Sequence, residues 1–238
     1  SNEVELIEMI PDEPVQAGDF KVDAYRVTHS IPHAVSYSFS CSAGTFFFTG
    51  DFKLDSNPID GYFTELQRIG DLGEQGVLAS TMDVTNSDRP GSTPSEATVG
   101  PALEEAYRGH QGRIFTTTFS SNVHRVQQIM NASVKLGRKV ILTGRSMIKN
   151  FNIAKDLGLV DYPLDRVYTL RDLPHLDPAE TSVILTGSQG EPLAALTRLA
   201  YNEHPGMQIQ DGDLVVFSAN PIPGNETAIH RVVDRLYK

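Results

Sequence analysis

Residues 26–55 read RVTHSIPHAVSYSFSCSAGTFFFTGDFKLD, and their pattern predicts a β-hairpin. Residues 34–41 alternate strictly between apolar or aromatic side chains and serines, which is typical of a β-strand with two different faces. Ser42–Gly44 predicts a tight turn, and residues 45–50 predict the returning strand. His29 and Asp51 then stand at the ends of predicted strands, and both are of types that ligate metal ions. Two ligands leave a hydrolytic metal site incomplete.

The spacing of the histidines does not by itself complete a zinc site. A lone histidine after a strand is more often bonded to a backbone carbonyl, and a lone aspartate is more often a cap. His33 lies four positions after His29, but Pro32 argues against a helix that would place both on one face. From the residues alone, metal ligation and a structural role both stay open for His29 and Asp51.

Composition limits the classes of protein and partner. The net charge is 20 − 30 = −10, which argues mildly against a nucleic-acid binder, although a focused basic cleft on an acidic body is compatible with one. No apolar run reaches about 18 residues, so no membrane span is expected. The acidic N-terminus does not resemble a signal peptide. The single cysteine, Cys41, excludes an internal disulfide and fits a reducing compartment such as the cytoplasm.

From about residue 77 the chain alternates between strands and helices. This rhythm predicts a parallel sheet flanked by helices. Thr93, Pro94 and Glu96 match a capping box that would begin a helix, which Gly100 and Pro101 are expected to interrupt. The change of pattern suggests a boundary near residue 85 between two parts that pack on each other. The expected strands are 113–119, 139–144, 182–187 and 213–219, and the expected helices are 121–137, 147–158, 191–200 and 225–238.

Each strand of the second part ends in a small polar cluster. In an open α/β sheet the carboxyl ends of the strands line the ligand crevice, where helix N-termini favour anions. The clusters therefore suit a phosphate or phosphodiester, although serine and asparagine are also ordinary helix caps. Arg145 follows Gly144, where a guanidinium is suited to fork onto phosphate oxygens or to form a salt bridge at the sheet edge. The clusters are TTTFSSN (116–122), TGRSM (143–147), TGSQGE (186–191) and SANPIPGNE (218–226).

Several longer motifs resemble ribonuclease J, a family of β-CASP ribonucleases on the metallo-β-lactamase fold. The resemblance covers nearly the whole chain. It implies an α/β protein in which residues 1–85 form the second part of a metallo-β-lactamase domain. Residues 86–238 would form a β-CASP domain with a parallel sheet flanked by helices. The motifs are VTHSIP, TGDFKLD, MDVTNSDRPGSTPSE, TTFSSNVHRVQQI, GRKVILTGRSM, TGSQGEPLAAL and FSANPIPGNE.

The resemblance implies a function and a site. The family cleaves single-stranded RNA as a 5′–3′ exonuclease and endonuclease in RNA processing and decay, using two divalent ions, usually zinc and sometimes manganese. His29 matches one metal ligand, and Asp51 matches the aspartate that bridges both ions. Asp83 matches the acidic residue of the first β-CASP motif, which would act in catalysis by orienting an acid/base histidine. The positions expected to bind RNA are Ser120, Asn122, Arg145, Ser146 and Ser188.

The chain also departs from the family pattern. The family's main ligand cluster, HxHxDH, and its later histidine motifs do not occur in this sequence, so an internal segment with an incomplete metal site is expected. His33 stands where an acidic residue is common, and Phe48 stands where histidine is frequent. The isolated chain is expected to be inactive. The full-length protein is expected to bind RNA with a 5′ monophosphate and to form homo- or hetero-oligomers, with no membrane partner.

Two other functions remain open at this point. One is a catalytically inactive RNA-binding or assembly subunit, or paralogue, suggested by the missing ligands and by His33 and Phe48. The other is an α/β protein that binds a small phosphorylated molecule, which the long motif matches disfavour.

Overall fold

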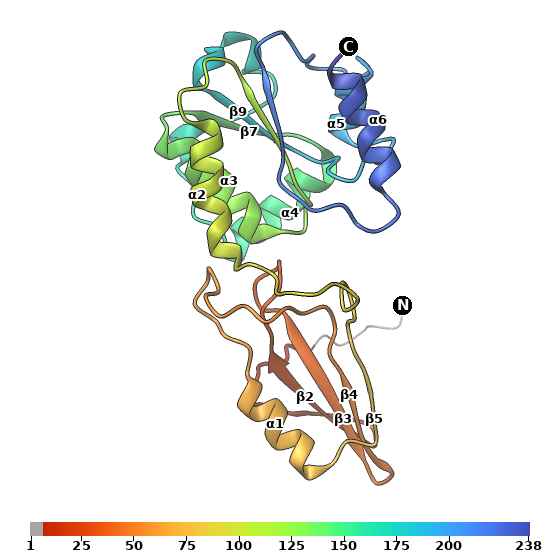
Figure 1. The fold of residues 1–238 in the computed structure, drawn as a ribbon. Coiled ribbons are helices and arrows are strands. Elements are labelled where there is room, and N and C mark those ends of the chain that lie inside the picture. Colours follow the sequence, from red (N-terminus) through yellow and green to blue (C-terminus); the bar gives the residue numbers. More distant parts are fainter. Residues whose placement is uncertain (1–6) are drawn as a thin grey trace, which may run out of the picture. The chain divides into compact units, whose positions relative to one another are not determined.

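The computed structural model describes residues 7–238, which form two compact units (Figure 1). The first unit ends at Ala97, and the second comprises Thr98–Lys238. The sequence-based boundary at residue 85 falls inside the first unit because the following segment is bonded to it. Ser95 Oγ donates to the Asn57 carbonyl at 2.7 Å, and the Glu96 N–H donates to the Asp55 carboxylate at 2.9 Å. Whether the two family domains meet at residue 85 stays a prediction.

The first unit is built on a five-stranded sheet in the order β1-β2-β3-β4-β5. Neighbouring strands are antiparallel except β4 and β5, which are parallel. The predicted hairpin is β3 with β4, and its turn ends at Gly44, whose φ of 137° lies in a region that favours glycine. The elements are β1 (Val15–Ala17), β2 (Phe20–Arg26), β3 (Val35–Cys41), β4 (Gly44–Phe48), α1 (Leu66–Gln75) and β5 (Ala79–Thr81).

The serine face of β3 is the buried face of this strand. Ser36 and Ser38 are only 1% and 2% exposed, whereas the aromatic residues of the opposite face are half-buried. Burial of these hydroxyls is tolerated because each one is hydrogen-bonded. Ser36 Oγ donates to the Thr49 carbonyl at 2.7 Å, and Ser38 Oγ lies 3.1 Å from the Tyr25 hydroxyl. Alternation alone had predicted two faces without indicating which one is covered.

The second unit is a parallel α/β sheet in the order β10-β6-β9-β7-β8, with every pair of neighbours parallel. This confirms the predicted parallel sheet flanked by helices. The elements are α2 (Val99–Tyr107), β6 (Ile114–Thr117), α3 (Val123–Lys135), β7 (Lys139–Leu142), α4 (Arg145–Asp156), β8 (Val167–Tyr168), β9 (Thr181–Leu185), α5 (Ala195–Ala200), β10 (Leu214–Phe217) and α6 (Glu226–Leu236). Short 3-10 turns cover Glu96–Thr98, Leu164–Arg166, Leu173–His175 and Pro178–Glu180.

Successive side chains of each strand enter two separate cores. Ile114 packs with α2, α3 and α4 on one face, and Phe115 packs with α5 and α6 on the other. This two-sided burial explains why the strands of the second unit are continuous apolar runs without alternation. Among residues 7–238, no helix has the length and apolar character needed to cross a bilayer.

The predicted start of the first helix of the second unit is wrong. The capping box at Thr93 does not form, because the N–H and side chain of Glu96 contact Asp55 and Lys53 of the first unit. The helix α2 begins instead at Val99. Pro101 therefore lies in the first turn, where the missing N–H costs little, and it does not interrupt the helix. Helix α1 and the short strands β1 and β8 were not predicted.

Candidate functional site

His29, Asp51 and Asp83 lie in adjacent loops at one end of the first sheet. Thr28 and Lys53 form an antiparallel bridge, in which the Lys53 N–H donates to the Thr28 carbonyl at 2.9 Å. His29 directly follows this bridge, and Asp51 precedes it by two positions. Asp83 arrives from β5, and its carboxylate accepts the N–H of Phe52 at 3.4 Å. The three side chains suggested by the family resemblance are thus placed by neighbouring backbone segments.

The three residues differ in environment. His29 is half-buried, with Nδ1 3.2 Å from Ser30 Oγ, and Asp51 is exposed. The hydroxyl and then the N–H of Thr85 hold the pKa of Asp83 below its ordinary value; burial opposes them, while the Phe52 N–H and the charge of His29 act in the same direction. Asp83 is therefore a carboxylate at neutral pH. Within residues 7–238, no group of three or more His, Cys, Asp or Glu side chains lies close enough to hold a metal ion.

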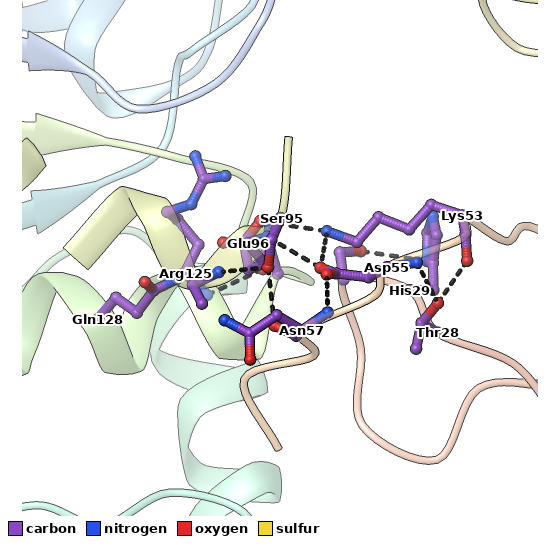
Figure 2. Close-up of polar contacts among 12 residues, drawn as sticks. Thr28, His29, Lys53, Asp55, Asn57, Ser95, Glu96, Arg125 and Gln128 are labelled. Atoms are coloured by element: carbon purple, nitrogen blue, oxygen red, sulfur yellow. Dashed lines mark hydrogen bonds and ion pairs between the residues drawn. The ribbon is translucent and has the colours of Figure 1, made fainter. Parts of the chain in front are cut away.

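A third aspartate, Asp55, organises the loops that carry these residues (Figure 2). Its side chain is only 1% exposed and lies 3.1 Å from Lys53 Nζ. Its carboxylate accepts the N–H groups of Asn57 at 3.0 Å and of Glu96 at 2.9 Å. Its own N–H donates to the Thr28 hydroxyl at 3.3 Å, and that hydroxyl donates to the Lys53 carbonyl. Asp55 thus fixes the strand end from which His29 emerges.

The electrostatics of Asp55 follow from this arrangement. Burial alone would raise its pKa, but the N–H groups of Glu96 and Asn57, followed by Ser95 and Lys53, outweigh burial and hold the pKa below the ordinary 3.8. Sequence reasoning did not single out Asp55, although the stretch Asp55-Ser56-Asn57 carries the signature of a turn in which an aspartate caps the N–H two residues later.

The two departures from the family pattern occupy distinct positions. His33 is exposed, with φ of 61°, and its ring centre lies 6.4 Å from that of Tyr62. Phe48 ends β4 opposite Tyr37 and is 44% exposed. His33 supplies no carboxylate at its position, and Phe48 supplies no imidazole at its own.

The second unit has a pocket of about 690 Å³ at the carboxyl ends of β6, β7 and β9. Three of the predicted RNA-binding residues line it: Ser120 after β6, and Arg145 and Ser146 in the first turn of α4. Arg145 and Ser146 are exposed, whereas Ser120 Oγ accepts a hydrogen bond from Asn150 Nδ2 at 3.2 Å. This location agrees with the crevice expected at the carboxyl edge of a parallel sheet.

Asn122 and Ser188 lie elsewhere. The Asn122 side chain accepts the Arg125 N–H at 2.9 Å and is the N-cap of α3, which is the alternative that the sequence had left open. Ser188 is 2% exposed and is not among the residues that line the pocket. Their contact with RNA stays a prediction.

Other polar residues line the same pocket, among them Thr118, Arg198 and His204, which were not among the predicted RNA-binding positions. Thr118 belongs to the polar cluster after β6 that the sequence had marked as suited to a phosphate, although it was not singled out as an RNA-binding position. Arg198 lies within α5, and His204 follows that helix. No local pattern marks these two as neighbours of Arg145, because only the packing of α5 on the sheet brings them there.

Comparison with known proteins gives a consistent result. Residues 111–236 match the family model of the β-CASP domain of ribonuclease J. A protein named ribonuclease J from Thermus thermophilus is 44% identical over 233 residues, which are 98% of this chain and 40% of that protein. Ribonuclease J of Mycolicibacterium smegmatis is 41% identical over 233 residues, 98% of this chain and 42% of that protein. The chain therefore spans about two fifths of these relatives.

A solved structure supports the fold alone. The crystal structure of a protein of unknown function from Enterococcus faecalis V583 matches with a TM-score of 0.54 and 15% identity. The match covers 98% of this chain and 60% of that one.

Proposed function

Because this chain belongs to the ribonuclease J family, we propose that it contributes to metal-dependent hydrolysis of single-stranded RNA phosphodiesters. The reaction would be that of a 5′–3′ exonuclease and endonuclease in cytoplasmic RNA processing and decay. The observation that carries this proposal is that His29, Asp51 and Asp83 lie on adjacent backbone segments at one end of the first sheet. The polar pocket of the second unit gives independent support for a phosphate-containing substrate.

The donor types at His29 and Asp51 fit a zinc or manganese ion. Neutral imidazole and carboxylate are accepted ligands of both metals. With Nδ1 of His29 beside Ser30 Oγ, Nε2 is the nitrogen left for a metal. The exposed Asp51 carboxylate would help to hold the ions through its oxygens. Two side chains are fewer than the three protein ligands of a catalytic zinc site, so further ligands would be needed to complete the metal centre.

The roles of the chain's own residues follow from their chemistry. Bound divalent ions would supply Lewis-acid activation of water and of the scissile phosphate. His29 and Asp51 would help to hold them, and Asp55 would keep the supporting loops in place. Asp83, which is ionised at neutral pH, would accept a hydrogen bond and orient an imidazole; it would not donate a proton.

The second unit would bind the RNA backbone. Arg145 and Ser146 present charged and neutral donors at the first turn of α4, a position that favours anions. Ser120 lines the same pocket, and Asn122 and Ser188 complete the proposed set. A local cluster of donors is compatible with a net charge of −10, because the field near a phosphate depends on the nearest groups. The proposed partner is single-stranded RNA with a 5′ monophosphate, and the full-length protein would form homo- or hetero-oligomers.

Metal analysis of the 238-residue chain tests the first part of this proposal. We expect fewer than two zinc ions per chain and no hydrolysis of RNA, because two ligands hold a metal weakly. Asp51→Ala should lower the bound zinc further, whereas Asp19→Ala, in the exposed turn before β2, should not. Equal zinc content in the wild type and in Asp51→Ala would remove Asp51 from the site. Two tightly bound ions with turnover would show that the ligand set is complete.

A second candidate function is an RNA-binding or assembly subunit without catalysis. It is favoured by the finding that residues 7–238 offer no group of three metal ligands, and by His33 and Phe48. RNA binding that is indifferent to zinc and to Asp51→Ala would support this alternative over the first.

A further inference from the structure

The pocket of the second unit is lined by cationic groups from two helices. Arg145 enters from the first turn of α4, and Arg198 enters from α5. The Arg145 guanidinium is exposed and makes no hydrogen bond or ion pair with residues 7–238. One nitrogen of Arg198 donates to the Glu203 carbonyl at 3.0 Å, which holds that side chain in place. A guanidinium presents five donors, so Arg198 keeps most of its binding capacity.

The pocket also contains a buried hydroxyl, that of Thr118, without a hydrogen-bond partner among residues 7–238. Thr118, after β6, is only 1% exposed and lines the pocket, yet its Oγ1 has no hydrogen-bond partner within the described chain. A buried hydroxyl without a partner destabilises the folded state, so its presence suggests a partner that arrives with a ligand. The N-cap of α4 is Gly144, which has no side chain that could accept the first N–H groups of that helix.

His204 is also held as a donor. The Gly206 N–H donates to Nδ1 of His204 at 3.3 Å, which places the proton of the neutral ring on Nε2. Burial, followed by the charge of Arg198, keeps the pKa of His204 below its ordinary value, so the neutral ring prevails near pH 7. The Nε2–H group is then available to an acceptor.

The pocket has fewer charged hydrogen-bond acceptors than donors. Glu191 is the only acidic residue that lines this pocket in the described chain. Its Oε2 accepts the Gln189 N–H at 3.1 Å, so the carboxylate is partly occupied by its own loop. A concave site with many donors and few acceptors selects an anion with several oxygens. The volume of about 690 Å³ falls within the range of about 300–1,000 Å³ that is usual for ligand pockets.

We propose that this pocket binds a phosphate group between Arg145 and Arg198, with the Thr118 hydroxyl and the His204 Nε2–H as further donors. The inference rests on the proposed function only for the source of the phosphate, which would be a phosphodiester of single-stranded RNA. The chemistry of the pocket itself, two guanidinium groups and two neutral donors around one anion, does not depend on catalysis.

Two measurements on the 238-residue chain test the proposal. Inorganic phosphate is titrated by ³¹P NMR, and a single-stranded oligoribonucleotide is titrated by fluorescence anisotropy at several salt concentrations. Arg198→Gln should weaken both affinities by about tenfold and reduce the slope of log affinity against log salt by about 0.7. Arg231→Gln removes the same charge from the exposed face of α6, outside the pocket, and should change neither affinity by more than about twofold.

Thr118→Val gives a second, independent readout. If the hydroxyl serves a ligand, its removal should weaken phosphate binding several-fold while raising the midpoint of thermal unfolding, since a buried unpaired hydroxyl is lost. A hydroxyl with a purely structural role would give the opposite, namely lower stability and unchanged phosphate binding.

The outcomes separate the pocket from the proposed function. Equal loss of RNA affinity in Arg198→Gln and Arg231→Gln would overturn the pocket proposal, because the effect would then be one of total charge. Loss of phosphate binding in Arg198→Gln with unchanged RNA affinity would overturn RNA as the source of the phosphate. Absence of RNA binding in the wild type, with phosphate binding intact, would overturn the proposed RNA function and leave the anion site in place.

Discussion

Asp55 combines nearly complete burial with an ionised carboxylate. Such a group is stable in the interior only when hydrogen bonds and a counter-charge replace its lost hydration. Here two backbone N–H groups and Lys53 do so. The segments that carry His29 and Asp51 are tied to Asp55 in two ways: Lys53 Nζ pairs with its carboxylate, and its backbone N–H donates to the Thr28 hydroxyl. The geometry of the proposed metal ligands therefore depends on a residue that is not itself a ligand.

Asp55→Asn should lower the free energy of unfolding of the first unit by about 2–3 kcal/mol, because hydrogen bonds to a charged acceptor are replaced by weaker ones. Since the folded-state pKa of Asp55 lies below 3.8, its contribution is fully present above that pH and is lost as the pH falls through the acid range. Urea unfolding at pH 7 and pH 3 measures both effects. Between pH 7 and pH 3, the free energy of unfolding should fall less for Asp55→Asn than for the wild type.

Asp19→Asn is the matched control for this substitution. It removes a carboxylate from the exposed turn before β2, and it should leave both the stability and its pH dependence unchanged. Equal acid sensitivity of the wild type and Asp55→Asn would show that another carboxylate governs the acid range.

At the scale of elements, the loop after β9 illustrates how tightly the strand ends of the second unit are packed. Gly190 has φ of 71°, and a Cβ at this position would lie 2.6 Å from the carbonyl carbon of Ala228 in α6. The backbone of this loop therefore approaches the helix more closely than any side chain would allow. Gln189 reinforces the approach, because its side-chain oxygen accepts the Ile222 N–H at 2.7 Å.

Gly190→Ala should destabilise the second unit by about 1–3 kcal/mol more than Gly158→Ala does. Gly158 has a similar φ of 68° but no neighbouring atom within 4 Å of an added Cβ, so its substitution reports the backbone strain alone. Chemical unfolding of the two variants gives the comparison directly. Equal decreases in the free energy of unfolding for the two variants would mean that α6 moves to accommodate the added methyl group without loss of stability.

At the scale of the whole molecule, the two units differ in the size of their apolar cores. Among the described residues of the first unit, the buried hydrophobic ones are Val22, Ala24, Tyr25, Val27 and Leu72, whereas the second unit buries two large clusters, one on each face of its sheet. Because burial of apolar surface is the main stabilising contribution, the first unit has the smaller driving force for folding.

The first unit is therefore expected to open more readily. Amide hydrogen exchange should show weaker protection in β2 and β3 than in β6 and β9, with a difference of at least tenfold in exchange rate. The comparison is internal to one sample, so it needs no variant. Equal protection across both sheets would indicate that the units unfold as one cooperative body.

The sequence by itself determined the hairpin, the β/α rhythm of the second unit and the polar character of its strand ends. These features depend on periodicity and turn residues within short stretches, so local pattern was sufficient. Family motifs added the positions of His29, Asp51 and Asp83, which the structure places at one sheet end. The start of α2 was predicted wrongly because a distant carboxylate, Asp55, competes for the backbone of Glu96.

Only the tertiary structure decided which face of β3 is buried, that Asp55 supports the loops of the proposed metal ligands, and that Arg198 and His204 stand across a pocket from Arg145. Each of these depends on contacts between residues that are far apart in the sequence. These long-range hydrogen bonds and packing contacts depend on how the helices pack on the sheets. No short stretch of sequence determines that packing.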